Sequence, residues 1–479
     1  MVVGLIERNR SPEPVVLPDF NVVDIGTLVS EDYYSITFRG KKIGYSSRIK
    51  KALPTGFIYQ ESSFYRLMVG GTVHEITAQG LLTVDDSLRT KIISFVFSGD
   101  NYETTVNASV RGSKLAVTVQ SPSGTRTSEY DLSGPIYSAT VIPEILVERD
   151  FDKANFELST FDPMTLSEQS YNIQVIGKDR IKRFGSSDVI IVRVNYGPLQ
   201  GKMYVDTSGV LLMEKTPEGF MSVRENKEVA FKLDIDDVSS DDLLTEFRIP
   251  AGGYIRRPRD AVRLELWIAN LPSELFKLDD YNQQWHPDSS TLIIDSRGLF
   301  PMDSLCCEVL PEDTSETAAI QCHDRRIVAL ANKITRGKKS NFEKLDAINE
   351  YLYENIEKNL TASIPSAIEV LSRMEGDCNE HSILFVALAR SLGIPARMNV
   401  GLMYMEEYFY YHAWVQAFAD SRWQTYDPTL LQSPVDATHI KLTSGGLDRT
   451  VVLLRLGDTS FDLIDIEYEE ENALTESAE

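Results

Sequence analysis

An apolar stretch late in the chain limits the folds open to this sequence. Residues 383–388 read Ile-Leu-Phe-Val-Ala-Leu and follow the polar hexapeptide Gly-Asp-Cys-Asn-Glu-His at 376–381. This order predicts a loop that opens a helix buried inside a domain. We expect the helix to end near Leu392-Gly393, because Pro395 cannot continue it. Cys378 would then lie at the helix N-terminus, where unpaired N–H groups and the helix dipole favour a thiolate.

The elements around this helix predict an α+β domain. Helical spacing of apolar residues predicts three further helices, at Arg325–Ile334, from Asn341 as N-cap to Ile356, and at Ser366–Arg373. Three strands follow the buried helix, at Ala396–Tyr404, Phe409–Phe418 and Trp423–Asp427. Helices followed by antiparallel strands are typical of the α+β class.

The N-terminal half of the chain has a different, β-rich pattern. Tyr33–Phe38, the turn Arg39–Lys42 and Ile43–Ser46 indicate a hairpin, and similar runs recur to about Lys232. Several runs alternate apolar with polar residues, which suits a sheet with one wet face. We expect one or two large antiparallel sheets. This half contains no catalytic cluster, and His74 alone is typical of a core or surface histidine.

The length of 479 residues implies two to four domains. The predicted divisions are an N-terminal linker or anchor stub at 1–21, a β-rich domain at 22–233, an acidic linker and small β module at 234–312, the α+β domain at 313–456, and an acidic tail at 457–479. Asp234–Asp242 is strongly acidic but lacks the Gly and terminal Glu of a calcium-binding loop.

Charge argues against a nucleic acid partner, and hydropathy argues against a membrane-spanning helix. The net charge of −23 would repel phosphate over most of the surface, so we expect no nucleic acid partner. The sequence contains no run of about 18 apolar residues, so it predicts no membrane-spanning helix. Met1–Ile6 is too short for the core of a signal peptide. It fits either the stub of an N-terminal anchor or an ordinary terminus, and the sequence leaves both open.

The four cysteines do not indicate a dense disulfide framework. Cys306 and Cys307 are adjacent, so at most one of them could pair with Cys322. Three free thiols fit the sequence equally well. Cysteine content therefore leaves the redox compartment open.

Three residues in order suggest nucleophilic catalysis. Cys378 at a helix start is followed by His412 in a strand and by Asp427 at the end of the next strand. Alone, a strand histidine is usually structural, and an Asp before Pro usually belongs to a turn. Together they supply a nucleophile, a base and a residue that orients the base.

A metal site at Cys378 is the rival interpretation. His381 stands three residues after Cys378 on one helix face, but two further ligands are missing nearby in the sequence. We therefore predict no metal and no cofactor. Four residues are expected to support the site: Asp377, Glu380, His381 and Trp414.

Five sequence blocks, in order, closely resemble the bacterial transglutaminase-like superfamily: Gly376–His381, Ala389–Arg397, Tyr411–Val415, Trp423–Thr429 and Asp436–Ile440. The resemblance covers about 317–442. It implies a papain-like core with Cys378 as nucleophile, His412 as base and Asp427 as its orienting acid.

The resemblance also implies a reaction. Cys378 would attack an amide carbonyl and form a thioester, which passes to water or to an amine. We expect a peptidase or amidase acting on a peptide, a protein or a peptidoglycan stem. The alternatives are a cross-linking protein-glutamine acyltransferase and a non-catalytic binding module of the cell envelope. The backbone N–H of Cys378 is the expected first oxyanion donor; Tyr351 and Tyr353 are weak candidates for the second.

The β-rich half adds an expectation about location. Gly40–Tyr45, Gly-Lys-Lys-Ile-Gly-Tyr, resembles the opening of β-rich domains that precede bacterial transglutaminase-like cores. Such proteins are commonly exported or membrane-anchored. We therefore expect the bacterial cell envelope, in the periplasm or outside the cytoplasm, with membrane proximity through an N-terminal anchor.

Overall fold

The computed structural model describes residues 25–469, apart from 70–71, 100–101, 152–154, 163–166, 186–187, 197–198, 218, 234–247, 299, 301–307, 318, 360–365, 446–455 and 458. The chain divides into two compact units, Met1–Asp242 and Leu243–Glu479, which are described separately. In the described part of the chain, no helix has both the length and the apolar character needed to cross a membrane.

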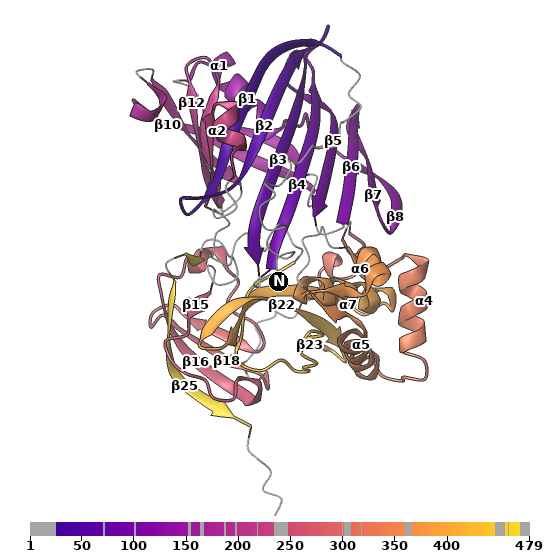
Figure 1. Ribbon diagram of the computed structural model, residues 1–479. Coiled ribbons are helices and arrows are strands. Elements are labelled where there is room, and N and C mark those ends of the chain that lie inside the picture. The colour runs from indigo at the N-terminus through magenta and orange to yellow at the C-terminus, as the bar shows by residue number, and fades with distance from the viewer. Residues whose placement is uncertain are drawn as a thin grey trace, which may run out of the picture. The chain divides into compact units, whose positions relative to one another are not determined.

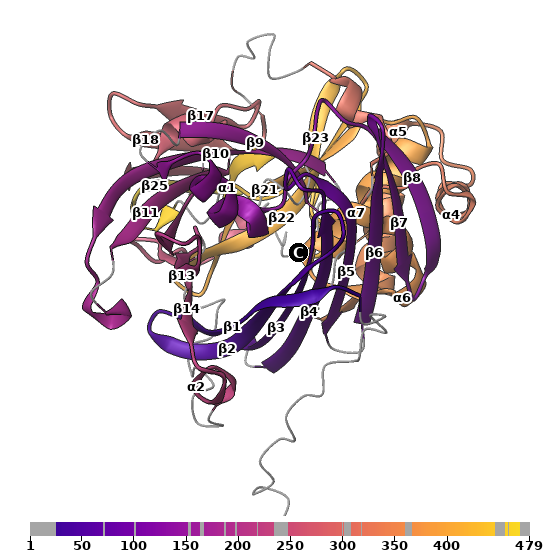
Figure 2. The ribbon, with the colours of Figure 1, turned by 90° about the horizontal axis from the view of Figure 1, so that it is seen from above.

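The first unit is built on one antiparallel sheet of fourteen strands (Figures 1 and 2). Eight strands follow one another along the chain as a meander, and six more continue the sheet from β1 in the spatial order β14 to β9. The strands are β1 Thr27–Phe38, β2 Lys41–Ala52, β3 Phe57–Val69, β4 Thr72–Val84, β5 Thr90–Gly99, β6 Tyr102–Arg111, β7 Lys114–Ser121, β8 Gly124–Asp131, β9 Asn155–Asp162, β10 Ser167–Asp179, β11 Val189–Tyr196, β12 Leu199–Asp206, β13 Leu211–Lys215 and β14 Phe220–Glu225. The prediction of a large antiparallel sheet is confirmed.

Local sequence explains the turns and the core of this unit. The β1–β2 hairpin turns at Arg39-Gly40, where both φ angles are positive, as a two-residue hairpin loop requires. The 3-10 turn η3 Ala139–Val141 and helix α1 Ile142–Glu148 bury apolar side chains, including Leu146, in the same core as strand residues such as Val192. The other helical elements here are η5 Lys182–Phe184 and α2 Lys227–Phe231.

The helices of the second unit surround the buried helix α7 Cys378–Ser391, beside β22 (Figure 1). They are α4 Arg325–Ile334, α5 Asn341–Asn355 and α6 Ala367–Arg373. The four predicted helices are confirmed, with one correction at the start of α5. Ser340, not Asn341, is the N-cap, because its side chain and that of Glu343 bond each other's backbone N–H.

Two antiparallel sheets complete this unit. The first has the order β15-β22-β21-β24, with β23 also paired to β22. Its strands are β15 Ile249–Pro250, β21 Ala396–Met405, β22 Tyr408–Ala419, β23 Arg422–Tyr426 and β24 His439–Ser444. The sequence predicted β21, β22 and β23 but not β24.

The second sheet shares a hydrophobic core with the first, which includes Leu264, Leu292, Leu402 and Ile440. Its order is β17-β18-β16-β25, with strands β16 Ala261–Ala269, β17 Gln283–His286, β18 Thr291–Asp295 and β25 Ser460–Tyr468. A short parallel pair, β19 Glu357–Lys358 and β20 Glu375–Gly376, and the 3-10 turns η7 Pro258–Asp260, η8 Ser273–Leu275 and η9 Pro311–Asp313 lie in the connections.

The prediction of an acidic tail from residue 457 is wrong for Ser460–Tyr468. This stretch is β25, which pairs with β16, and Phe461 packs against Phe409 with ring centroids 4.9 Å apart. Apolar and acidic residues alternate there apart from Ile464, where the pairing with β16 shifts register, and such alternation is the period of a half-buried strand. Three other predicted features lie outside the described residues: the 1–21 stub, the acidic run Asp234–Asp242, and Cys306 with Cys307.

Candidate functional site

Cys378 is the first residue of α7, and its neighbours fix that position. The Asp377 carboxylate accepts from the Asn379 N–H at 2.7 Å, and the Glu380 carboxylate accepts from the Asp377 N–H at 2.9 Å. These bonds form a capping box, which defines where a helix begins. Gly376 is required before it, because a Cβ there would lie 2.3 Å from the Cβ of Glu380.

Two contacts hold this helix start against β22 on either side of His412. The backbone of Ala413, the next residue after His412, forms a hydrogen bond with the Cys378 thiol. The hydroxyl of Tyr411, the residue before His412, donates to the Asn379 side chain. The first turn of α7 therefore lies on the stretch of strand that carries the histidine.

The Cys378 thiol lies in a surrounding that disfavours charge. Burial raises its pKa well above the ordinary value, the negative charge of Asp377 adds to the increase, and the Ala413 hydrogen bond opposes it. The expectation that the helix start favours the thiolate is therefore wrong for the free protein. At neutral pH the resting group is a thiol, which needs a base to become a nucleophile.

His412 and Asp427 form a buried pair. The Nε2 atom of His412 lies 2.8 Å from Oδ2 of Asp427, and the two residues are 6% and 0% exposed. The other carboxylate oxygen of Asp427 accepts from the backbone N–H groups of Thr429 at 2.8 Å and Leu430 at 3.2 Å. Since Nε2 is engaged, Nδ1 is the ring nitrogen of His412 that can accept a proton.

A second histidine, His439 on β24, shares the same carboxylate oxygen. Its Nε2 lies 3.3 Å from Oδ2 of Asp427, and its Nδ1 lies 3.4 Å from Oδ1 of Asp436. Sequence reasoning gave His439 no role. The block Asp436–Ile440 was part of the family resemblance, and that block was the available signal.

The charges of Asp427, His439 and Asp436 stabilise one another. Burial favours the neutral forms, but His412 and His439 hold the pKa of Asp427 well below its ordinary value. Burial likewise opposes a charge on His439, yet Asp436 and Asp427 raise its pKa to about 9. The pKa of Asp436 falls to about 2 despite burial, because of His439 and Arg259.

The predicted supporting residues lie around these groups. His381 places Nδ1 2.7 Å from the carbonyl oxygen of Asp377, and burial lowers its pKa, so it is neutral. Burial, followed by the charge of Asp377, raises the pKa of Glu380. The Trp414 ring meets His439 edge to face at 5.2 Å and stacks on His412 at 6.2 Å.

The two tyrosines considered as oxyanion donors lie in different environments. Tyr351 packs against the helical core, a cluster that also contains Cys378, and the Tyr353 ring lies under the Lys358 ammonium at 4.0 Å.

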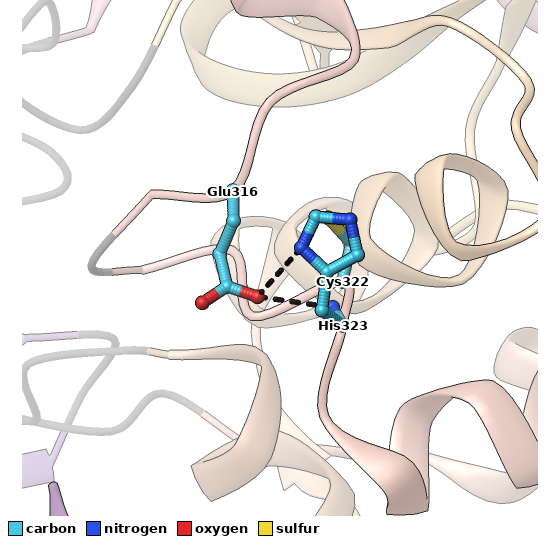
Figure 3. A group of neighbouring side chains, drawn as sticks. All are labelled: Glu316, Cys322 and His323. Carbon is cyan, nitrogen blue, oxygen red and sulfur yellow. Dashed lines mark hydrogen bonds and ion pairs between the residues drawn. The ribbon is translucent and has the colours of Figure 1, made fainter.

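Two groups of side chains in the described ranges hold metal-ligand atoms within 4.8 Å of one another. One is His412, Asp427 and His439, whose hydrogen bonds already account for the short distances. The other is Glu316, Cys322 and His323 (Figure 3). There Glu316 accepts from the His323 backbone N–H at 3.0 Å and faces its ring nitrogen at 3.3 Å. Hydrogen bonds account for the first cluster, and in the second they join Glu316 to His323 while Cys322 is the residue next to His323 in the chain, so we assign neither as a metal site.

Comparison with known families identifies the region that contains this site. The sequence model of the transglutaminase-like superfamily matches residues 328–428, a span that includes Cys378, His412 and Asp427. The chain contains a transglutaminase-like domain. No curated protein matches the chain.

Three solved structures resemble parts of this chain, all weakly. A "beta-barrel-like protein" of a domain of unknown function from Brucella abortus has 12% identity and a TM-score of 0.35, over 42% of this chain and 98% of that one. A "putative cysteine protease" from Cytophaga hutchinsonii has 19% identity and a TM-score of 0.27, over 46% and 83%. A "putative protease" from Parabacteroides distasonis has 12% identity and a TM-score of 0.19, over 78% and 70%.

Proposed function

We propose that this protein is a cysteine hydrolase that cleaves amide bonds of a peptide, a protein or a peptidoglycan stem, with Cys378, His412 and Asp427 as its catalytic triad. One observation carries the proposal. The Cys378 thiol is hydrogen-bonded to the backbone of Ala413, the residue after His412. The His412 ring is in turn hydrogen-bonded to the buried carboxylate of Asp427. A nucleophile, a base and an orienting acid in this order are what acyl transfer requires.

The first half of the proposed reaction forms a thioester. His412 Nδ1 takes the thiol proton as the sulfur of Cys378 bonds to the amide carbon, and the carbonyl oxygen becomes an oxyanion. The backbone N–H of Cys378 at the helix start donates to that oxyanion. The C–N bond then breaks as His412 returns its proton to the leaving amine.

The second half releases the acid product. His412 takes a proton from water, whose oxygen attacks the thioester carbon, and the C–S bond breaks as the proton returns to the sulfur. Asp427 keeps the imidazole in one orientation and stabilises its positive charge in both halves. An amine in place of water would make the same site an acyltransferase.

The test is hydrolysis of a library of peptides and peptidoglycan-derived stem peptides by the full chain. Cys378→Ala is expected to lose about 10³-fold or more in kcat/KM. Cys322→Ala is the matched control, since Cys322 is also a buried free cysteine and should retain activity. Turnover that survives in Cys378→Ala would contradict the proposal. Product linked to an added amine would instead assign acyl transfer.

A further inference from the structure

The hydrogen-bond partners of His439 favour its protonated form. Nε2 faces Oδ2 of Asp427 at 3.3 Å, and Nδ1 faces the Asp436 carbonyl oxygen at 3.3 Å and its carboxylate Oδ1 at 3.4 Å. The carbonyl oxygen is an acceptor only, and so are the two carboxylates in their ionised form. A neutral imidazole carries one N–H, so it would leave one nitrogen lone pair against an oxygen. Both nitrogens are satisfied only when His439 is an imidazolium.

The count of buried charges agrees with this assignment. Asp436 has its own cation, because Arg259 Nη1 donates to it at 2.7 Å, and Thr438 donates to it through its N–H and hydroxyl. The other buried cation on β24, Lys441, is paired with Asp280. The fully buried Asp427 has the His439 and His412 rings as its charge partners, beside the backbone N–H groups of Thr429 and Leu430. A buried carboxylate needs such a partner.

We propose that His439 is a positioning residue of this site, a protonated imidazole that fixes the Asp427 carboxylate and balances its negative charge. The inference rests on the proposed function of Cys378, His412 and Asp427. Without His439, Asp427 would keep its hydrogen bonds from the His412 ring and from the N–H groups of Thr429 and Leu430, but it would lose a neighbouring positive charge. Its negative charge would then favour the protonated form of His412. With His439 in place, Asp427 orients His412 while leaving Nδ1 free to accept the proton of the thiol.

The charge on His439 can be observed without any substrate. The full chain has six histidines, so labelling their Cε1 atoms with ¹³C gives few NMR signals. The signal lost in His439→Gln identifies His439, and its titration is expected to give a pKa of about 9. Asp436→Asn retains the His439 imidazole but removes a negative charge beside it, so the pKa of His439 should fall. The signal that shifts in this variant gives a second route to the assignment. A signal that titrates at or below the ordinary histidine range would overturn the proposal.

The positioning role is tested by the pH profile of kcat/KM, whose acidic limb reports the base of the free enzyme. In His439→Gln, which can still donate one hydrogen bond, we expect this limb to move to higher pH by about one unit. A fold defect alone would lower the rate at all pH values without moving the limb. His74→Gln, which removes a buried histidine of the other unit, is the control.

The two proposals fail separately. If Cys378→Ala retains turnover, the triad is wrong, and the NMR titration still decides the charge of His439. If Cys378→Ala is inactive but His439→Gln keeps the wild-type acidic limb, the triad stands and the positioning role is overturned.

Discussion

At the scale of single residues, the site combines a neutral nucleophile with a highly charged support. Burial and the nearby Asp377 keep Cys378 protonated at rest, whereas Asp427 and His439 are ionised. A thiol of this kind is activated by transfer of its proton to a base at the moment of attack. This differs from a preformed thiolate–imidazolium pair, and alkylation of the thiol can distinguish the two.

The charge of Asp377 predicts how Cys378 responds to pH. In Asp377→Asn the side chain can still cap α7, but the negative charge beside the thiol is gone. The half-point for iodoacetamide labelling of Cys378, followed by mass spectrometry of its peptide, should therefore fall to lower pH than in the wild type. Asp324→Asn changes the N-cap of α4 in the same way and serves as the control. An unchanged half-point in Asp377→Asn would refute this account of the thiol.

The sequence was informative for some site residues and not for others. Cys378, His412 and Asp427 stand in an order and in sequence blocks that suggest their roles. His439 stands in a strand of mixed polarity, His-Ile-Lys-Leu-Thr-Ser, in which polar residues look solvent-exposed. Asp436 is only three residues away in the sequence, but the partner Asp427 becomes visible only after β24 is placed beside β21. Lys441 was missed for the same reason, since Asp280 is 161 residues away.

At the scale of elements, the close pairing of β24 with β21 carries His439 to the site. Gly401 on β21 lies opposite His412 on one side and Lys441 on the other. A Cβ at Gly401 would lie 2.0 Å from the carbonyl oxygen of Ile440, so only glycine permits this approach.

Gly401→Ala is therefore expected to push β24 away from β21. Overpacking of this kind costs about 1–3 kcal/mol, which chemical denaturation followed by far-UV circular dichroism can measure. The acidic limb of the pH profile should also move as it does in His439→Gln. Gly80→Ala in β4 is the matched control, because a Cβ there meets no atom within 4 Å. Equal stability of both variants would contradict the assigned pairing.

At the scale of the whole molecule, local patterns predicted the classes of the two units but not all their pairings. Alternation of apolar and polar residues predicted a large antiparallel sheet. That the fourteen strands form one sheet depends on the β1–β14 pair, such as Tyr33 with Glu225, which no local pattern encodes. The acidic end of the chain was misassigned because its charge obscured the alternation of Phe461, Leu463 and their acidic neighbours.

The strand at the acidic end predicts a stability effect that a solvated tail would lack. Phe461 is 2% exposed and packs on Phe409, so Phe461→Ala should cost about 3–5 kcal/mol. Ile464→Ala on the same strand, where the side chain is 52% exposed, should cost far less. Denaturant unfolding of the full chain measures both. Similar small losses in the two variants would contradict the placement of β25.

The central claim, that Cys378 forms an acyl thioester, has one direct measurement. The full chain is mixed with an activated peptide ester, quenched in acid within the first turnover, and mapped by peptide mass spectrometry. We predict the mass of the acyl group on the peptide that contains Cys378, and its absence in Cys378→Ala. Turnover with no acyl group on Cys378, or with the group only on another residue, would contradict the account.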